Sequence, residues 1–574
     1  MNILSTAAYS TKFLKTEPAK THSVIPGFGL SLGVTLAWLS FIVLIPLSSL
    51  VFTAFEPGFE SFWKVIASRR VLAGLRVSFL CALTAAAINA VFGVLLAWTL
   101  VRYEFPFKRL ADGLIELPFA LPTAVAGISL TQLYSNNGII GAFLGKFGVQ
   151  AAYTRLGIIV ALVFVTVPFV VRTIQPVLER LDSRYEEAAV TMGAGRVRIW
   201  FSVVFPEILP ALLTGFGLAF ARALGEYGTV VFIAGNKPFK TETAPLLIMT
   251  KLQQFDYSGA AAVALATLAG AFLILLFINA AQLYFGRFLK GENDGAARPQ
   301  RRSLFSAGLA GRLSVAVCCA FLFVMLVIPL CLVLFASLKN GWDVYWAAVS
   351  DKYTVSAFRL TIISAVAAVA ANTVFGLFAT WLLTRFDFKG KKTLTTLIDV
   401  PFTVSPVIAG LVFILMFGRI GWAYPLLKKY GIEIVFALPG IILAVIFVTF
   451  PFVARELIPV LDARGRDEEE AAALMGAGGW TIFRKITLPN IKWALLYGVI
   501  LCAARAMGEF GAVSALSGHL RGKTNTLPLH VEVLYNDFKT TQAFAVSSLL
   551  AILAVLILVA RNIVENRGFR EEQS

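Results

Sequence analysis

Twelve apolar segments, each about twenty residues long or more, constrain the fold of this chain more than any other feature of its sequence. A helix needs about twenty apolar residues to cross the hydrocarbon layer of a bilayer. Only 14% of the residues are charged, whereas an ordinary soluble chain has about a quarter. The sequence therefore predicts an all-α integral membrane protein with twelve transmembrane helices. The segments lie near 28–53, 75–101, 115–134, 156–174, 208–232, 259–285, 313–336, 358–384, 398–418, 435–454, 491–516 and 542–561.

The third of these segments is interrupted by Pro118 and Pro122, so its start is left open. Proline removes a backbone donor and crowds the preceding turn of a helix.

The second half of the chain repeats the first at one offset. Glu470 follows Glu187 by 283 positions (470 − 187), and Gly476 follows Gly193 by the same number. Six spans per copy is an even number, so both copies enter the membrane in the same orientation. Parallel repeats of this kind fit a pseudo-two-fold axis along the membrane normal. Other pairs at the same offset are Pro118 and Pro401, Pro168 and Pro451, Arg102 and Arg385, Arg222 and Arg505, and Glu226 and Glu509.

Basic residues in the short loops predict which side of the membrane each loop faces, because such loops collect in the cytoplasm. The clusters after the second and fourth spans and in the central linker share one side if the amino terminus is inside. Arg69 and Arg70 fall on the other side. We attribute the net charge of +17 to these loops and expect no nucleic-acid partner.

Both termini are expected to lie in the cytoplasm. The expected organisation is a cytoplasmic tail, a six-helix domain, a cytoplasmic linker, a second six-helix domain and a second tail, at 1–27, 28–285, 286–312, 313–561 and 562–574.

Two polar segments, one in each half, share the pattern Glu-Ala-Ala, three residues, then Gly. An aliphatic residue and a hydrophobic-Pro pair follow each Gly. In the first segment Ser183 and Glu186 predict a capping box, and Gly193 with Gly195 predicts the helix end. A helix of about nine residues is too short to be stable alone in water, so it needs a surface. The pattern residues are Glu187, Ala188, Ala189 and Gly193, then Glu470, Ala471, Ala472 and Gly476.

An apolar face is expected on the first of these helices at helical spacing, formed by Tyr185, Ala188, Ala189 and Met192. In the second helix Asp467 takes the cap position, three residues before Glu470. The alternative is an ordinary amphipathic loop helix that packs on its own chain.

This repeated pattern resembles the signature loop of importer-type ATP-binding-cassette permeases. The resemblance implies that each loop forms a short cytoplasmic helix that docks on a separate ATPase subunit. It therefore implies two copies of that ATPase, with ATP and Mg²⁺ bound there and no cofactor bound by this chain. The segment GHLRGKT is one residue short of a phosphate-binding loop, lacks a strand-turn-helix context, and is rejected as a nucleotide site.

Two charged pairs are expected well inside the bilayer at i, i+4 spacing, where both members share a helix face. They are Arg222 with Glu226, and Arg505 with Glu509. A charge at this depth costs at least a few kcal/mol unless it is paired or faces a wet cavity. The pairs therefore line a translocation path or form structural ion pairs between the halves.

Matched segments beginning at Gly235 and Gly518 follow these pairs at the outer end of the fifth span of each half. Lysine, hydroxyl groups and Gly-rich backbone suit a tetrahedral oxyanion. The alternative is a re-entrant loop with solvated lysines. The candidate path residues are Lys240 and Thr241 in the first half, and Lys523 and Thr524 in the second.

The segments ARALGEYGTVVFIAGNKPFKTETAPLLI and ARAMGEFGAVSALSGHLRGKTNTLPLHVEVLYNDF resemble the first and second permease subunits of bacterial sulfate/thiosulfate importers. The resemblance implies a fused permease in the inner (plasma) membrane of a bacterium that imports an oxyanion by alternating access, with a periplasmic binding protein as a further partner. Molybdate, tungstate or phosphate remain alternative cargoes, and an ion-gradient-driven twelve-helix transporter is a second alternative. Five scattered cysteines and three histidines predict no metal site, and no catalytic residue is expected.

Overall fold

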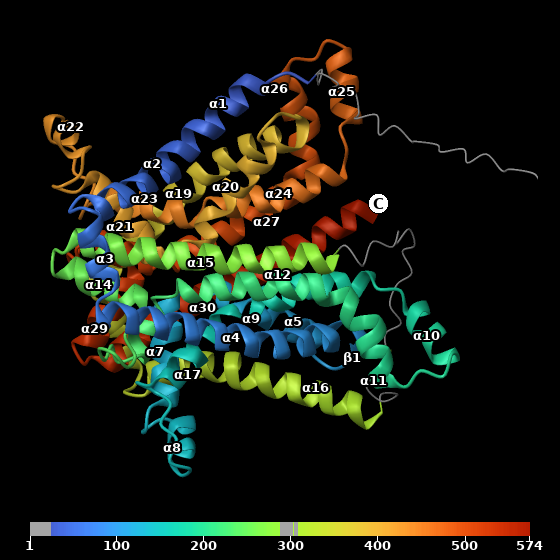
Figure 1. Ribbon diagram of the computed structural model, residues 1–574, viewed down its shortest axis with the longest axis horizontal. Coiled ribbons are helices and arrows are strands. Elements are labelled where there is room, and N and C mark those ends of the chain that lie inside the picture. Colours follow the sequence, from blue (N-terminus) through green and yellow to red (C-terminus); the bar gives the residue numbers. More distant parts are fainter. Residues whose placement is uncertain (1–24, 287–301, 304–307, 574) are drawn as a thin grey trace, which may run out of the picture.

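The computed structural model describes residues 25–286, 302–303 and 308–573 (Figure 1). Within these ranges ten helices are long and apolar enough to cross a membrane. Two further helix pairs meet the same test but are sharply bent. The predicted all-α membrane fold is confirmed, and a two-residue parallel pair, β1 (Tyr103–Glu104) with β2 (Arg302–Ser303), is the strand structure in the described ranges.

The helices of the two halves follow one another in the same order. The first half has α1 (Phe28–Leu39), α2 (Ile45–Phe55), α4 (Arg69–Arg102), α5 (Lys108–Ile115), α6 (Leu117–Ala120), α7 (Thr123–Tyr134), α9 (Arg155–Arg180), α11 (Arg196–Ile199), α12 (Phe205–Leu224) and α15 (Tyr257–Gly286). The second half has α16 (Leu309–Leu322), α17 (Ile328–Leu338), α19 (Lys352–Arg385), α20 (Lys391–Thr403), α21 (Pro406–Phe417), α23 (Leu438–Thr449), α24 (Pro451–Ala463), α26 (Gly479–Ile482), α27 (Leu488–Met507) and α30 (Thr540–Gln573).

Shorter helices lie between the long ones. They are α3 (Phe59–Ile66), α8 (Ile139–Gly145), α10 (Ser183–Thr191), α13 (Val230–Ile233), α14 (Ala244–Gln253), α18 (Trp342–Ser350), α22 (Tyr424–Lys429), α25 (Asp467–Leu474), α28 (Gly511–Leu516) and α29 (Leu527–Asn536). Residues 1–24 of the predicted first tail and most of the predicted linker 286–312 lie outside the described residues, whereas α30 continues through the predicted second tail to Gln573.

The third span of each half is bent rather than straight. The segments Lys108–Ala120 and Thr123–Gly145 meet at 108°, and Lys391–Thr403 and Pro406–Phe417 meet at 103°. The first bend falls at Pro122, which cannot donate to the preceding turn, so the helix ends before it. Each bend brings irregular backbone to the interior of the protein, where other segments can satisfy it.

The fifth span of each half begins and ends earlier than predicted. The helices run over Arg196–Leu224 and Gly479–Met507, not over 208–232 and 491–516. Gly225 and Gly508 follow the last helical residue in each copy. Apolar content alone had extended the prediction across these glycines into α13 and α28, which are separate short helices.

A π-helical turn precedes a proline in the first and fifth spans of both halves. The turns end at Leu44, Val204, Val327 and Thr487, and in each case the proline lies two residues later. A proline ring clashes with the carbonyl group four residues before it. The wider π turn relieves this clash and lets the helix continue with a local bend.

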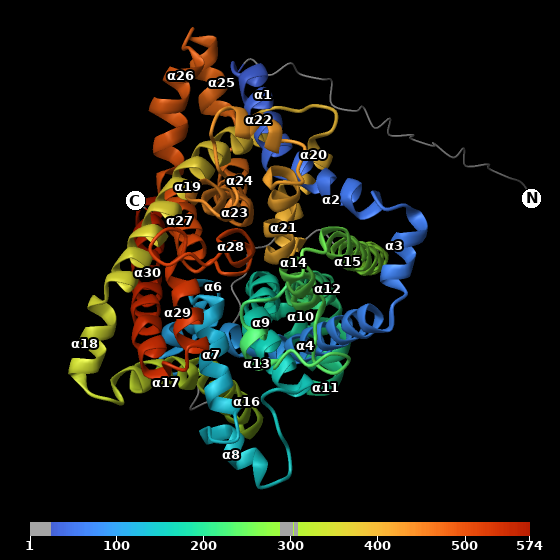
Figure 2. The ribbon, with the colours of Figure 1, turned by 90° about the vertical axis from the view of Figure 1, so that its left-hand side faces the viewer.

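The first span of each half packs on the opposite half. Helix α1 contacts α19, and its counterpart α16 contacts α4. The following segments α2 and α17 pack on their own last spans, α15 and α30, and also reach α21 and α7 of the other half. Figure 2 shows the two bundles beside each other with these exchanged helices at their edges. The exchange ties the two repeats into one body.

Within each half, the second and fourth spans approach closely at a glycine. A Cβ atom on Gly93 would lie 2.6 Å from Val170, and one on Gly376 would lie 2.7 Å from Val453. Small residues permit this close approach of membrane helices. Nearby, Asn89 donates a 2.8 Å hydrogen bond to Thr166, a buried link that is repeated in the second half. The fourth span, which carries part of the site, is therefore held firmly.

Candidate functional site

The two signature segments form short helices, α10 and α25, that project at the same end of the molecule (Figure 1). Their lengths of nine and eight residues agree with the predicted docking helix. They follow the fourth spans almost directly, because only residues 181–182 and 464–466 intervene. A displacement of either short helix is therefore passed to a long helix of the same half.

The predicted cap of the second helix is wrong, and the one predicted for the first involves a side chain outside the described residues, that of Ser183. Asp182 caps α10 by accepting a 2.9 Å hydrogen bond from the Arg184 backbone. In the second half Asp467 is already inside α25, and the residue before it makes no side-chain cap. Glu186, the expected partner in a capping box, is instead paired with Arg102 of α4.

Glycine ends both helices, as predicted for the first at Gly193, whereas Gly195 precedes α11. Gly193 and Gly476 have φ values of 80° and 85°, in the left-handed region that favours glycine. The next residue in each copy, Ala194 or Ala477, donates its backbone N–H to the carbonyl group five residues earlier. This arrangement is a Schellman-type end, which stops the helix at a defined residue.

A buried ion pair anchors each short helix to the second span of its half. Arg385 donates a 3.0 Å hydrogen bond to Glu469, and the exposed fractions of their side chains are 3% and 4%. Glu469 also accepts a 2.6 Å bond from Thr487. The corresponding pair is Arg102 with Glu186, which is 22% exposed. The sequence pointed to the matched arginines but not to their glutamate partners, which directly precede the Glu-Ala-Ala pattern.

The outer surface of these helices carries uncovered apolar side chains. Met192 and Met475 occupy equivalent positions and are 80% and 88% exposed. The helices that follow, α11 and α26, carry Val197 and Trp480, which are also equivalent and are both 72% exposed. Of the predicted apolar face of α10, Tyr185, Ala188 and Met192 are exposed, whereas Ala189 is buried against the protein itself. Exposed methionine and tryptophan side chains at matched sites are typical of surfaces that bind another protein.

The remaining pattern residues face outward or lie at the edge of the helix. Glu187 and Ala471 are exposed, whereas Glu470 and Ala472 are half-buried. None of the eight pattern residues, Glu187, Ala188, Ala189, Gly193, Glu470, Ala471, Ala472 and Gly476, lines the cavity described next.

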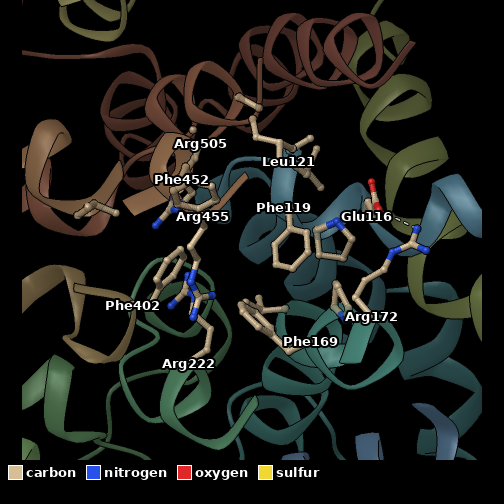
Figure 3. Close-up of a pocket in the computed structure, with 18 of the residues that line it drawn as sticks. Glu116, Phe119, Leu121, Phe169, Arg172, Arg222, Phe402, Phe452, Arg455 and Arg505 are labelled. Carbon is tan, nitrogen blue, oxygen red and sulfur yellow. Dashed lines mark ion pairs between the residues drawn. The ribbon is translucent and has the colours of Figure 1, made fainter. Parts of the chain in front are cut away.

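A cavity of about 390 Å³ lies between the two halves (Figure 3). Its walls come from the bent third span, the fourth span and the fifth span of each half, together with α30. Both members of six matched pairs line it: Pro118 and Pro401, Phe119 and Phe402, Phe169 and Phe452, Arg172 and Arg455, Leu218 and Leu501, and Arg222 and Arg505. The cavity therefore follows the pseudo-two-fold symmetry of the repeats.

Five arginines and two glutamates line this cavity. The arginines are Arg172, Arg222, Arg455, Arg505 and Arg561, and the glutamates are Glu116 and Glu456. In Figure 3, Arg222, Arg455 and Arg505 lie on one side and Glu116 with Arg172 on the other. Guanidinium groups are always charged and offer several donors in a plane, so a cavity with this lining suits an oxyanion.

Arg222 and Arg505 form the expected ion pairs, but only the arginine of each pair lies on the helix, whereas both members were predicted to share a helix face. Each arginine lies in the last turn of its helix and contacts Glu226 or Glu509 at 2.7 Å. The glutamates lie beyond the helix end, not on its face. Glu226 accepts a 2.9 Å hydrogen bond from the Thr229 backbone, and Glu509 is bonded similarly. Each carboxylate thus caps the following segment while it orients the arginine.

Arg172 and Arg455 were not selected from the sequence as site residues. Arg172 contacts Asp112 at 2.8 Å and Glu116 at 2.7 Å. Arg455 contacts Asp399 at 2.9 Å and lies over the Phe402 ring at 4.4 Å from its centroid. Their equal positions in the two repeats, 283 residues apart, are the signal in the sequence that could have found them.

The outer segments do not reach the cavity. Lys240 and Lys523 are exposed, and neither lines it. Thr241 and Thr524 are buried and organise local turns by accepting from the backbone of Lys237 and Leu520, at 3.0 and 3.3 Å. The structure brings Arg222, Glu226, Arg505 and Glu509 into one region and leaves these four residues outside it.

A family model described as "Binding-protein-dependent transport system inner membrane component" matches this chain twice, at residues 89–291 and 372–567. The sulfate transport system permease protein CysT of Salmonella typhimurium is 50% identical over 272 residues, which are 47% of this chain and 98% of that protein. The corresponding CysW protein of Synechocystis is 46% identical over 255 residues, 44% of this chain and 92% of that protein. CysW of Escherichia coli is 44% identical over 249 residues, which are 43% of this chain and 86% of that protein.

Proposed function

This chain belongs to the family of binding-protein-dependent transport system inner membrane components, and we propose that it is the transmembrane permease component of an ATP-driven sulfate or thiosulfate import system. It is a multi-pass inner membrane protein with two permease-length units in one polypeptide. The names of its relatives support sulfate as the cargo.

One observation supports the mechanism most directly: the fourth span of each half links the cavity to a docking helix. In the first half α9 carries Arg172 in the cavity wall and ends two residues before α10. In the second half α24 carries Arg455 and ends three residues before α25. When two partner subunits close, they move α10 and α25 together. The cavity arginines then move with them, which is the coupling that alternating access requires.

The partners follow from this geometry. The exposed apolar side chains of α10 and α25 receive two copies of a cytoplasmic ATPase, which bind ATP and Mg²⁺, and this chain itself has no ATPase site. The opposite end receives a periplasmic sulfate- or thiosulfate-binding protein. Both termini are then in the cytoplasm, as the basic loops indicate.

An anionic cargo is supported by the arginines of the cavity. Their carboxylate partners neutralise them when the cavity is empty, which lowers the cost of holding charge inside the bilayer. An arriving oxyanion replaces part of these contacts with charge-assisted hydrogen bonds from the same guanidinium groups. The path residues are therefore Arg172, Arg222, Arg455 and Arg505, with Glu226 and Glu509 as the groups that hold two of them.

Reconstitution in liposomes tests this function. The chain is inserted with its ATPase, the binding protein is added on the opposite side, and uptake of radiolabelled sulfate is measured. Uptake is expected only when both ATP and the binding protein are present. An excess of unlabelled thiosulfate is expected to compete, whereas stronger competition by molybdate, tungstate or phosphate would reassign the cargo. Uptake driven by a proton gradient without ATP would contradict the proposal.

A further inference from the structure

One ionic cluster in the cavity departs from the symmetry of the repeats. Glu116, in the first half, is contacted by Arg172 of α9 and by Arg561 of α30 in the second half. Arg561 is 9% exposed and Glu116 is 7% exposed, so both are buried. The contact joins residues 445 positions apart in the chain. It is therefore a buried ionic link between the two halves, at the wall of the cavity.

Comparison of equivalent positions shows what is unusual. Glu116 and Arg172 correspond to Asp399 and Arg455, which form the same pair in the second half. Arg561 corresponds to Ile278 (561 − 283), and Asp112 corresponds to Thr395 (112 + 283). Arg172 in the first-half cluster thus has an additional acidic partner, Asp112, and the cluster has an additional base, Arg561.

The charges of the additional acid, Asp112, and the additional base, Arg561, compensate each other. Asp112 and Glu116 both contact Arg172, so without Arg561 two carboxylates would share one guanidinium. The extra base comes from the opposite half and contacts the buried carboxylate. The Arg561 guanidinium also lies over the ring of Tyr497, 4.8 Å from its centroid, in the cavity wall. Both contacts hold it in one place.

An unneutralised carboxylate in this wall would repel a dianion, because charges interact strongly where water is scarce. Like charges placed together also suppress binding of the wrong partner. We propose that Arg561 is a positioning residue for anion passage: it neutralises Glu116 and thereby leaves Arg172 able to attract the oxyanion. This inference rests on the proposed function only in taking the cargo to be an anion.

Compensating substitutions test this role. Arg561→Ile, which installs the residue of the equivalent position, is expected to raise KM for sulfate uptake about tenfold, which corresponds to about 1.4 kcal/mol. Adding Asp112→Thr removes the extra acid and is expected to restore KM to within about twofold of the original value. Arg561→Lys keeps the charge and is expected to change KM little. In each case the amount of protein in the membrane and its association with the ATPase are measured in parallel.

The double variant distinguishes two roles of Arg561: neutralisation of Glu116 and packing between the two halves. If Arg561 only holds the two halves together, Asp112→Thr cannot rescue Arg561→Ile, and Arg561→Lys fails as well; either result overturns the proposal. Glu116→Gln in the Arg561→Ile background is a second rescue, because it removes the same negative charge. If the protein carries another oxyanion, the wild type takes up no sulfate. The KM values of the variants, measured with that other oxyanion, are then expected to fall in the same order.

Discussion

Ser405 donates a 2.7 Å hydrogen bond to the carbonyl oxygen of Gly225 across the interface of the two halves. Ser405 lies at the bend of the third span of the second half, and Gly225 ends the fifth span of the first. At the equivalent place Gly508 lies against Pro122. Each Arg-Glu pair therefore lies next to the bend of the opposite repeat, and Gly508 at this contact also lines the cavity.

The close contact between Gly225 and Ser405 predicts that a side chain at Gly225 disturbs both stability and transport. A Cβ atom there would lie 3.0 Å from Ser405 Cα, which is backbone and cannot turn aside. Gly225→Val is expected to destabilise the protein by about 1–3 kcal/mol, the usual cost of overpacking, as measured by thermal unfolding in detergent. Gly29→Val is the control, because nothing lies within 4 Å of a Cβ at that helical glycine. Equal stability of the two variants would contradict the described packing.

The ion pairs that anchor α10 and α25 are expected to differ in strength. Arg385→Ala leaves Glu469 buried without its cation, which typically costs about 3–5 kcal/mol. Arg102→Ala is expected to cost less, because Glu186 is 22% exposed and water can solvate it. Thermal unfolding of the two variants measures the difference. A larger effect from Arg102→Ala would be inconsistent with the burial of the second pair.

The cavity arginines are expected to act on KM. Arg455 is 41% exposed in its side chain, so Arg455→Gln is expected to keep the fold and raise KM for the oxyanion about tenfold. Arg172→Gln is expected to lower the yield of folded protein as well, because it removes a partner of the buried Glu116. Arg419→Gln, at an exposed position outside the cavity, is the control. An unchanged KM for Arg455→Gln would show that the anion does not pass Arg455 in this cavity.

Glu532 predicts a pH dependence of stability. It lies in α29, outside the membrane-spanning helices, and burial raises the pKa of its carboxyl group to about 7. The unfolded chain ionises near the ordinary value of 4.5. Stability is therefore unaffected below that pH, falls as pH rises to about 7, and stays lower above it.

Glu532→Gln removes this penalty. The variant is expected to match the wild type near pH 4 and to be more stable by roughly 3 kcal/mol at pH 8. Melting temperatures in detergent across this range test the prediction. A constant difference between the two proteins at every pH would show that the carboxyl group does not ionise differently in the folded state.

The sequence predicted the spans, the repeat and the docking helices because these depend on local composition and a fixed offset. The predictions were wrong or incomplete where contacts between distant parts of the chain determine a helix end or an ion-pair partner. The end of the fifth span at Gly225 depends on its seat against Ser405, and the partner of Glu186 is Arg102, far along the chain. Arg561 could not have been selected from the sequence, because its role depends on a carboxylate in the opposite half.

Transport therefore depends, in this account, on two short helices that pass an external motion to the cavity. The most direct test is ATP-driven sulfate uptake by the double variant Gly193→Asp with Gly476→Asp, in liposomes that contain the ATPase. Both positions are open to solvent but have left-handed backbone, so a side chain there disturbs the docking end and not the membrane core. Gly145→Asp, in α8 and also in open space, is the control. We expect the double variant to insert normally, lose ATPase co-purification and take up no sulfate, whereas uptake at the wild-type rate with normal co-purification would contradict the account.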